Sequence, residues 1–231
     1  MSELHGSLPL SEIDTDSAVR EAVAQIATDT RSGFLRKAGI GGAALVGGAA
    51  FLGALPSIAD AAAIPASDIA ILNFALTLEY LESAFYAQAV AGGALTDPDT
   101  VRFASVVSQH EADHVAFLKG VLGSKAVATP TFDFQGTTAD QGMFQATADA
   151  LENTGVHAYL GQVPNIKTPA VLLGAGRILP IEARHAAWIR DIRFAGGTTV
   201  EQTPAPGAFE DGFTMAAILA TVKATGVITP A

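Results

Sequence analysis

The chain has 231 residues, of which 49% are hydrophobic and 16% are charged, so it holds enough apolar material for one well-filled core. Its 13 Lys and Arg against 23 Asp and Glu give a formal net charge of −10, which lacks the basic surface that nucleic-acid binding needs, and we expect no nucleic-acid partner. The absence of cysteine excludes disulfides, thiolate metal sites, iron–sulfur clusters and cysteine nucleophiles. Any metal must therefore be held by His and carboxylate side chains.

The first 63 residues are interpreted as a polar leader followed by an export signal or membrane anchor. Residues 1–30 are polar and acidic, and a short helix is expected over residues 17–27. Residues 38–59 are 22 residues without a charge, preceded by three basic side chains in residues 31–37 and followed by small residues with A-x-A spacing. This layout is typical of a cleaved export signal, and a retained anchor is the alternative, because the segment is just long enough to span a bilayer. Both interpretations place the rest of the chain beyond the membrane, since the positive flank stays in the cytoplasm.

The basic flank itself indicates an export route. Residues 31–36, Arg-Ser-Gly-Phe-Leu-Arg, resemble the twin-arginine export signal with its pattern R-R-x-F-L-K, except that Ser32 stands at the second Arg. We expect a periplasmic or extracellular protein, or one anchored to the membrane through residues 38–59 and facing the periplasm.

Beyond residue 64 the sequence predicts helices with clear start and stop signals. Asp97-Pro98 and Thr168-Pro169 are typical helix starts, and Thr138 to Gln141 has capping-box spacing. Four long helices are expected, over residues 67–90, 97–121, 138–160 and 168–197. At about 30–38 Å each, they have the proportions of a four-helix bundle. The predicted organisation is a bundle over residues 64–197 with a long connection at 124–137, followed by a C-terminal extension over 198–231 that contains one short helix within 211–224.

Two motifs on these helices combine a carboxylate with an imidazole. Glu111-Ala112-Asp113-His114 lies on the second helix and Glu182-Ala183-Arg184-His185 on the fourth, and each places Glu and His one turn apart on one face. The first and third helices also match, because Glu79 precedes Tyr86 by seven residues and Glu152 precedes Tyr159 by seven. The sequence from residue 64 onward therefore reads as two copies of a helical hairpin.

The acidic residues of this repeat predict a metal centre. Glu79 and Glu152 have apolar neighbours and are expected to face the core, where four ionised carboxylates would repel one another strongly. Two divalent cations carry the charge that balances four glutamates, and neutral imidazoles complete their coordination. The predicted ligands of this dinuclear site are Glu79, Glu111, His114, Glu152, Glu182 and His185.

This pattern resembles the ferritin-like di-metal carboxylate proteins, in which two helices each supply a Glu and two others each supply Glu-x-x-His. Residues 73–82, Asn-Phe-Ala-Leu-Thr-Leu-Glu-Tyr-Leu-Glu, and residues 110–114, His-Glu-Ala-Asp-His, are similar to exported bacterial ferritin-like proteins related to plant desiccation-related proteins. The resemblance covers residues 67–194. It implies an all-α, ferritin-like four-helix bundle with the same six ligands.

The resemblance implies a metal-dependent protein but does not identify its reaction, because the family includes ferroxidases, oxygen-activating oxidases, peroxidases and manganese catalases. We expect two divalent ions, iron first and manganese second, and an oxidoreductase acting on O2, peroxide or ferrous iron in stress protection. The alternative is a non-enzymatic ferritin-like scaffold or a membrane-anchored interaction subunit. A homo-oligomer fits the pattern, but a closed storage shell is not expected, because the long connection and the tail are additions to the minimal bundle.

Several residues near these motifs have more than one expected role. Glu82 is the alternative to Glu79 or a support for it; Glu79 is preferred because its spacing to Tyr86 is repeated in the other copy. His110 points about 100° away from Glu111 and is expected beside the site or on the surface, and His157 is expected off the site. Tyr86 and Tyr159 are expected either to act as redox or hydrogen-bonding groups or to fill the core. Asp113 and Arg184 are expected either to orient the imidazoles or to be ordinary surface charges.

Overall fold

The structure is a computed structural model that describes residues 64–229. The expected helix at 17–27 and the export signal or anchor at 38–59 lie outside the described residues. Among the residues that are described, no helix is both long and apolar enough to cross a membrane.

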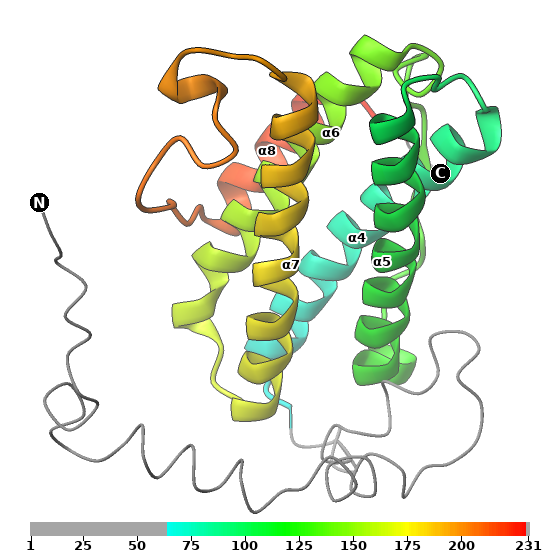
Figure 1. Cartoon of the computed structure of the whole chain (residues 1–231). Helices are drawn as coiled ribbons and strands as arrows, with labels where there is room; N and C mark the ends of the chain where they lie inside the picture. Colours follow the sequence, from blue (N-terminus) through cyan, green and yellow to red (C-terminus); the bar gives the residue numbers. More distant parts are fainter. Residues whose placement is uncertain (1–63, 230–231) are drawn as a thin grey trace, which may run out of the picture. The chain divides into compact units, whose positions relative to one another are not determined.

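Four long helices form the bundle shown in Figure 1: α4 (Ala66–Gly92), α5 (Pro98–Leu122), α6 (Gln141–Gln162) and α7 (Pro169–Arg193). Helix α4 packs along α5 and α6 packs along α7, so the bundle consists of two hairpins. Helices α4 and α7 run one way along the bundle and α5 and α6 run the other way (Figure 1). The all-α class and the helical bundle predicted from the sequence are confirmed.

Local capping explains where the helices begin. The side chain of Asp97 accepts a hydrogen bond from the Thr100 N–H, and that of Asp140 accepts one from the Met143 N–H. Pro98 and Pro169 occupy first helical positions, where a missing N–H costs nothing. The expected capping box at Thr138 is wrong, because the Thr138 hydroxyl instead accepts a hydrogen bond from the Gln88 side chain on α4.

The helix ends follow the sequence signals less closely. Helix α4 ends at Gly92, and Gly93 takes the left-handed conformation (φ 63°) that glycine adopts without strain. Helix α7 ends at Arg193, before the predicted stop at residues 196–197, because Phe194 leaves the helical conformation (φ −109°, ψ 27°) and its carbonyl oxygen accepts a hydrogen bond from the Gly197 N–H in a tight turn.

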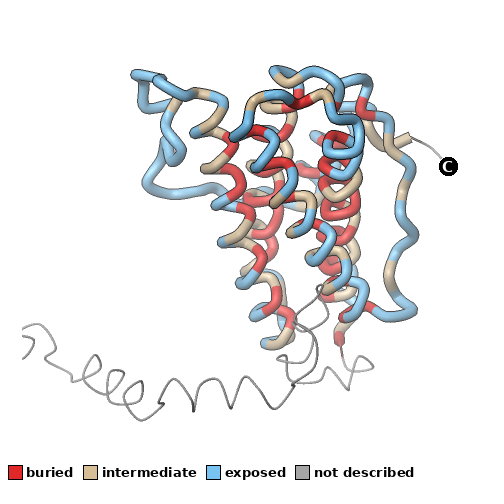
Figure 2. The backbone as a smooth tube through the Cα atoms, turned by 45° about the vertical axis from the view of Figure 1, so that its right-hand side comes forward, coloured by how far each residue is buried: buried red, intermediate tan, exposed pale blue. Residues whose placement is uncertain are grey.

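The long connection and the C-terminal extension pack on the bundle together. Helices α5 and α6 are parallel, so the chain between them has to return along the length of the bundle, as Figure 2 shows. Strand β1 (Thr131–Phe132) in this connection pairs antiparallel with β2 (Ile228–Thr229) near the end of the chain. Helix α8 (Met215–Thr225) buries Ile218 and Val222 against the core beside α6.

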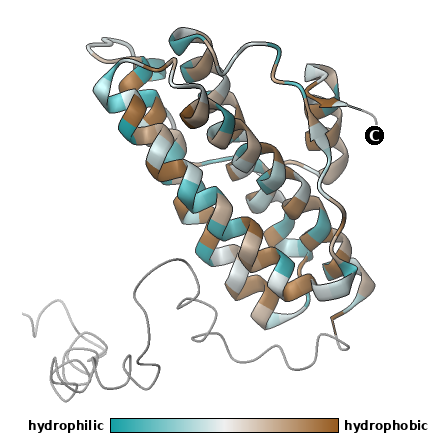
Figure 3. Cartoon of the chain, turned by 90° about the vertical axis from the view of Figure 1, so that its right-hand side faces the viewer, coloured by the Kyte–Doolittle hydropathy of each residue, from teal (hydrophilic) through white to brown (hydrophobic). Residues whose placement is uncertain are grey.

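The core consists of two apolar clusters with a polar layer between them. One cluster is rich in aromatic side chains and includes Phe85, Phe103 and Phe144, and the other is mainly aliphatic and includes Leu76 and Leu118. On each of the four helices a buried glutamate lies between residues of the two clusters. Buried positions face the inside of the bundle (Figure 2), and polar and apolar residues alternate around the helices (Figure 3). The glutamates are therefore shielded from water on both sides along the bundle.

Candidate metal centre

Four glutamates, one from each helix of the bundle, meet in this polar layer. Glu79 of α4, Glu111 of α5, Glu152 of α6 and Glu182 of α7 each have no solvent-exposed surface. His114 and His185 join them from α5 and α7, one turn after Glu111 and Glu182. The fold thus brings together all six residues predicted from the sequence.

The two imidazoles point their Nδ1 atoms at the carboxylates. His114 Nδ1 lies 3.1 Å from Glu79 Oε2, 3.2 Å from Glu111 Oε2 and 3.1 Å from Glu182 Oε1. His185 Nδ1 lies 3.2 Å from Glu111 Oε1 and 3.2 Å from Glu152 Oε2. The two oxygens of Glu111 therefore face different imidazoles.

The ligand atoms form two overlapping groups, each able to hold a metal ion. One group is Glu79, Glu111, His114 and Glu182; the other is Glu111, Glu152, Glu182 and His185. Within each group the ligand atoms lie within 4.8 Å of one another. Glu111 and Glu182 belong to both groups, so two ions held here would share two carboxylates.

Unsatisfied polar atoms indicate that the site fits cations. Within residues 64–229, five buried side-chain atoms form no hydrogen bond: Glu111 Oε1, Glu152 Oε2, both carboxylate oxygens of Glu182, and His185 Nδ1. The imidazole contacts of 3.1–3.2 Å to three of these oxygens are ion-pair distances without hydrogen-bond geometry. Such atoms are rare in folded proteins and costly in free energy. All five belong to the two ligand groups, and their oxygen and imidazole chemistry suits iron or manganese.

The comparison with known families agrees with this geometry. The sequence pattern of the ferritin-like domain family matches residues 67–195, more than half of the chain. The chain belongs to this family. No curated protein matches the chain.

Without metal, the centre of this ferritin-like protein is expected to take up protons in place of cations. Burial raises the pKa of Glu111 to about 7, and burial together with the charges of Glu111 and Glu79 raises the pKa of Glu182 well above its usual value. Burial disfavours the charged form of the imidazoles, but the surrounding carboxylates outweigh it and raise the pKa of His185 to about 10 and that of His114 further. Metal ions have to displace these protons in order to bind.

Two tyrosines hold the outer glutamates by hydrogen bonds that cross the bundle. The Tyr86 hydroxyl on α4 donates to Glu152 Oε1 on α6, and the Tyr159 hydroxyl on α6 donates to Glu79 Oε1 on α4. The two helices run in opposite directions, so the tyrosine two turns beyond one glutamate reaches the other glutamate. Both expected non-redox roles are observed, because each tyrosine is buried in the core and is bonded to a candidate ligand.

Of the neighbouring polar residues, His110 contacts the site. His110 Nδ1 lies 2.9 Å from His185 Nε2, which orients the His185 ring so that its Nδ1 faces the carboxylates. Asp113 is exposed and is bonded to Gln109, and Arg184 is exposed. His157 pairs with Glu210 of the C-terminal extension at 3.2 Å, which agrees with its expected place off the site.

Glu82 is a fifth buried carboxyl group beside the centre, with 3% of its surface exposed. It belongs to neither ligand group, whereas Glu79 belongs to one. Burial raises the pKa of Glu82 well above its usual value, and the charges of Glu182 and Glu152 raise it further. The sequence predicted Glu82 either to replace Glu79 or to support it, and the structure places it beside the centre while Glu79 keeps its place in a ligand group. The available signal was that the repeat has glycine at the matching position, Gly155.

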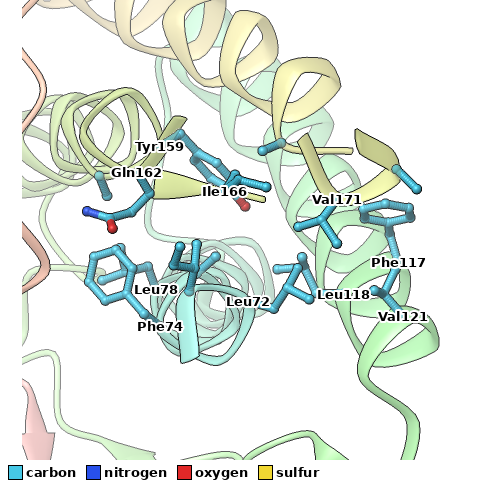
Figure 4. A pocket seen from close by; sticks show the side chains of 15 residues that line it. Leu72, Phe74, Leu78, Phe117, Leu118, Val121, Tyr159, Gln162, Ile166 and Val171 are labelled. Carbon is cyan, nitrogen blue, oxygen red and sulfur yellow. The ribbon is translucent and has the colours of Figure 1, made fainter. Parts of the chain in front are cut away.

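A small apolar cavity of about 20 Å³ lies at the end of the bundle where α4 and α7 begin (Figure 4). Its lining includes Leu72, Phe117 and Val171 and contains no charged side chain. Tyr159 also lines the cavity and donates its hydroxyl hydrogen to Glu79. The cavity therefore ends one side chain away from a candidate metal ligand.

The metal-free protein is predicted to lose stability as the pH rises from about 5 to about 9. The folded state binds more protons than the unfolded chain, because the pKa of Glu111 moves from 4.5 to about 7 and that of His185 from 6.5 to about 10. Stability from such groups is complete below the unfolded pKa and is lost as the pH rises through the folded pKa. Thermal unfolding of metal-free protein across this range provides the measurement; a midpoint that stays level or rises would contradict the prediction. Glu79 does not reverse it, because its lowered pKa acts only at more acidic pH.

The crossed hydrogen bonds predict matched effects of two substitutions. Tyr86→Phe and Tyr159→Phe should each weaken metal binding by about 10-fold or more, because each leaves one carboxylate less firmly oriented. Competition with a chelator measures the affinities. Tyr80→Phe is the control, since the Tyr80 hydroxyl makes only a 3.5 Å contact with the Val127 carbonyl oxygen. Equal affinities in all three variants and the wild type would show that the crossed bonds do not position the ligands.

Proposed function

We propose that this ferritin-like protein is exported and holds two divalent metal ions, iron first and manganese second, in a centre with oxidoreductase activity. The observation that carries the proposal is the sharing of Glu111 and Glu182 between the two ligand groups. Shared carboxylates hold two ions close together, which suits reactions that transfer more than one electron to a small oxidant.

The residues of the chain have separate tasks in this proposal. The bound ions supply electron transfer and Lewis acidity toward a small oxidant. Glu79 and Glu152 would each hold one ion, and Tyr159 and Tyr86 keep these two carboxylates in place. The two apolar clusters above and below exclude water from the carboxylates, so that the charge of the ligands acts at low dielectric.

Among the expected substrates, O2, peroxide and ferrous iron, the apolar cavity favours O2. An apolar lining suits an uncharged diatomic molecule better than a hydrated cation, which would have to lose its water there. A volume of about 20 Å³ has room for one such molecule.

Metal content and turnover test the proposal. Protein purified without an affinity tag should contain about two metal ions per chain and should oxidise ferrous iron with O2 or consume peroxide. Glu111→Gln removes a shared ligand and should reduce both metal content and turnover, whereas Glu201→Gln, an exposed carboxyl group, should change neither.

The outcomes separate the two classes of function. Two bound ions without turnover on any of the three substrates would favour a non-enzymatic scaffold. Wild-type protein with well below one ion per chain, together with unchanged thermal stability in Glu111→Gln, would overturn the dinuclear centre.

Export is supported by the basic and apolar pattern of residues 31–63. N-terminal sequencing of protein recovered outside the cytoplasm tests it. A start near Ala62 or Ile64 indicates cleavage, and a start at Met1 in the membrane fraction indicates a retained anchor. Full-length protein found in the cytoplasmic fraction alone would contradict export.

A further inference from the structure

The two halves of the centre differ at one position. The repeat matches Glu79 and Tyr86 of α4 with Glu152 and Tyr159 of α6. One turn after the glutamate, α4 carries Glu82 whereas α6 carries Gly155. The centre therefore has a carboxyl group on one side that the other half does not repeat.

Gly155 leaves the space that the Glu82 carboxyl group uses. A Cβ atom at position 155 would lie 2.9 Å from Glu182 Oε2 and 3.4 Å from Glu82 Oε1. The carboxyl groups of Glu82 and Glu182 therefore approach the same point from two helices. A side chain at this position of α6 would push at least one of them away.

The position of Glu82 along α4 assigns it to one half of the centre. It lies about 4.5 Å further along the helix than Glu79, in the direction of Tyr86. The Tyr86 hydroxyl bonds Glu152, which belongs to the group with His185, whereas Glu79 belongs to the group with His114. Glu82 thus lies on the side of Glu152 and His185.

We propose that Glu82 is a fifth carboxylate ligand of the centre and binds the ion held by Glu152 and His185, which makes the two metal positions inequivalent. The inference rests on the proposed dinuclear centre. Glu182 Oε2 is buried, forms no hydrogen bond and faces the same point beside Gly155 as Glu82 Oε1, so two carboxylate oxygens meet there without a hydrogen-bond donor between them. Five carboxylates carry one negative charge more than two divalent ions balance, so this position favours an ion of higher charge.

Titration of the metal-free full-length protein with Mn²⁺ tests the inference, with free Mn²⁺ measured by electron paramagnetic resonance. The wild type should bind two ions with unequal affinity. Glu82→Gln should weaken the tighter step at least about tenfold and leave the weaker step unchanged. Glu79→Gln should do the reverse and weaken the looser step.

A control variant and a second measurement complete the test. Asp149→Asn alters a buried carboxyl group that pairs with Arg190 and Arg193 outside the centre, and it should leave both steps unchanged. If Glu82→Gln does not fold, stepwise addition of Co²⁺ to the wild type decides: two different absorption spectra support inequivalent positions, and two identical spectra overturn them.

The two proposals fail in different ways. A wild type that binds two Mn²⁺ ions, with both steps unchanged in Glu82→Gln, would overturn the role of Glu82 alone. A wild type that binds fewer than two ions would overturn the dinuclear centre and this inference with it.

Discussion

Repulsion among buried carboxylates is the constraint on which the rest of this structure depends. Glu79, Glu111, Glu152 and Glu182 are fully enclosed by the bundle, and Glu82 adds a fifth acidic group beside them. Leaving such charges uncompensated in a protein interior costs several kcal/mol per ion in order of magnitude. Protons can supply the compensation, as the raised pKa values of Glu111 and His185 indicate, and metal ions can do so more completely. The middle of the bundle is therefore stable only when positive charge is bound there.

In the duplicated hairpin, each half helps to hold the buried glutamates of the other half in place. Each half supplies an outer glutamate, a shared glutamate and a histidine, and each half also supplies the tyrosine that holds the outer glutamate of the other half. The halves are thus joined by hydrogen bonds at the centre as well as by apolar packing above and below it. Metal bound at the centre would therefore also hold the two hairpins together.

The two hairpins differ at positions beside the centre, and these differences bear on its proposed function. Glu82 faces Gly155 instead of a matching acid, so the two candidate ligand groups have different surroundings. The apolar cavity ends at Tyr159, whose hydroxyl bonds Glu79, the outer glutamate of the other candidate ligand group. The proposed tighter ion and the apolar cavity proposed to favour O2 therefore lie on different sides of the centre. The C-terminal helix α8 and strand β2 pack on the bundle beside α6 and the long connection and do not supply ligands.

The sequence by itself determined the four long helices and the six residues that meet at the centre. Helix starts such as Asp97-Pro98 and the Glu-x-x-His spacing are properties of single helices, and the repeat shows which positions correspond. Tertiary structure alone decided that Tyr86 bonds Glu152 across 66 residues of chain, that His110 contacts His185, and that β1 pairs with β2. It also overrode the local capping signal at Thr138, whose hydroxyl bonds Gln88 of another helix. These contacts join segments that are distant in the chain, so their geometry depends on how the helices pack against one another. The spacing of residues within a single helix does not determine that packing.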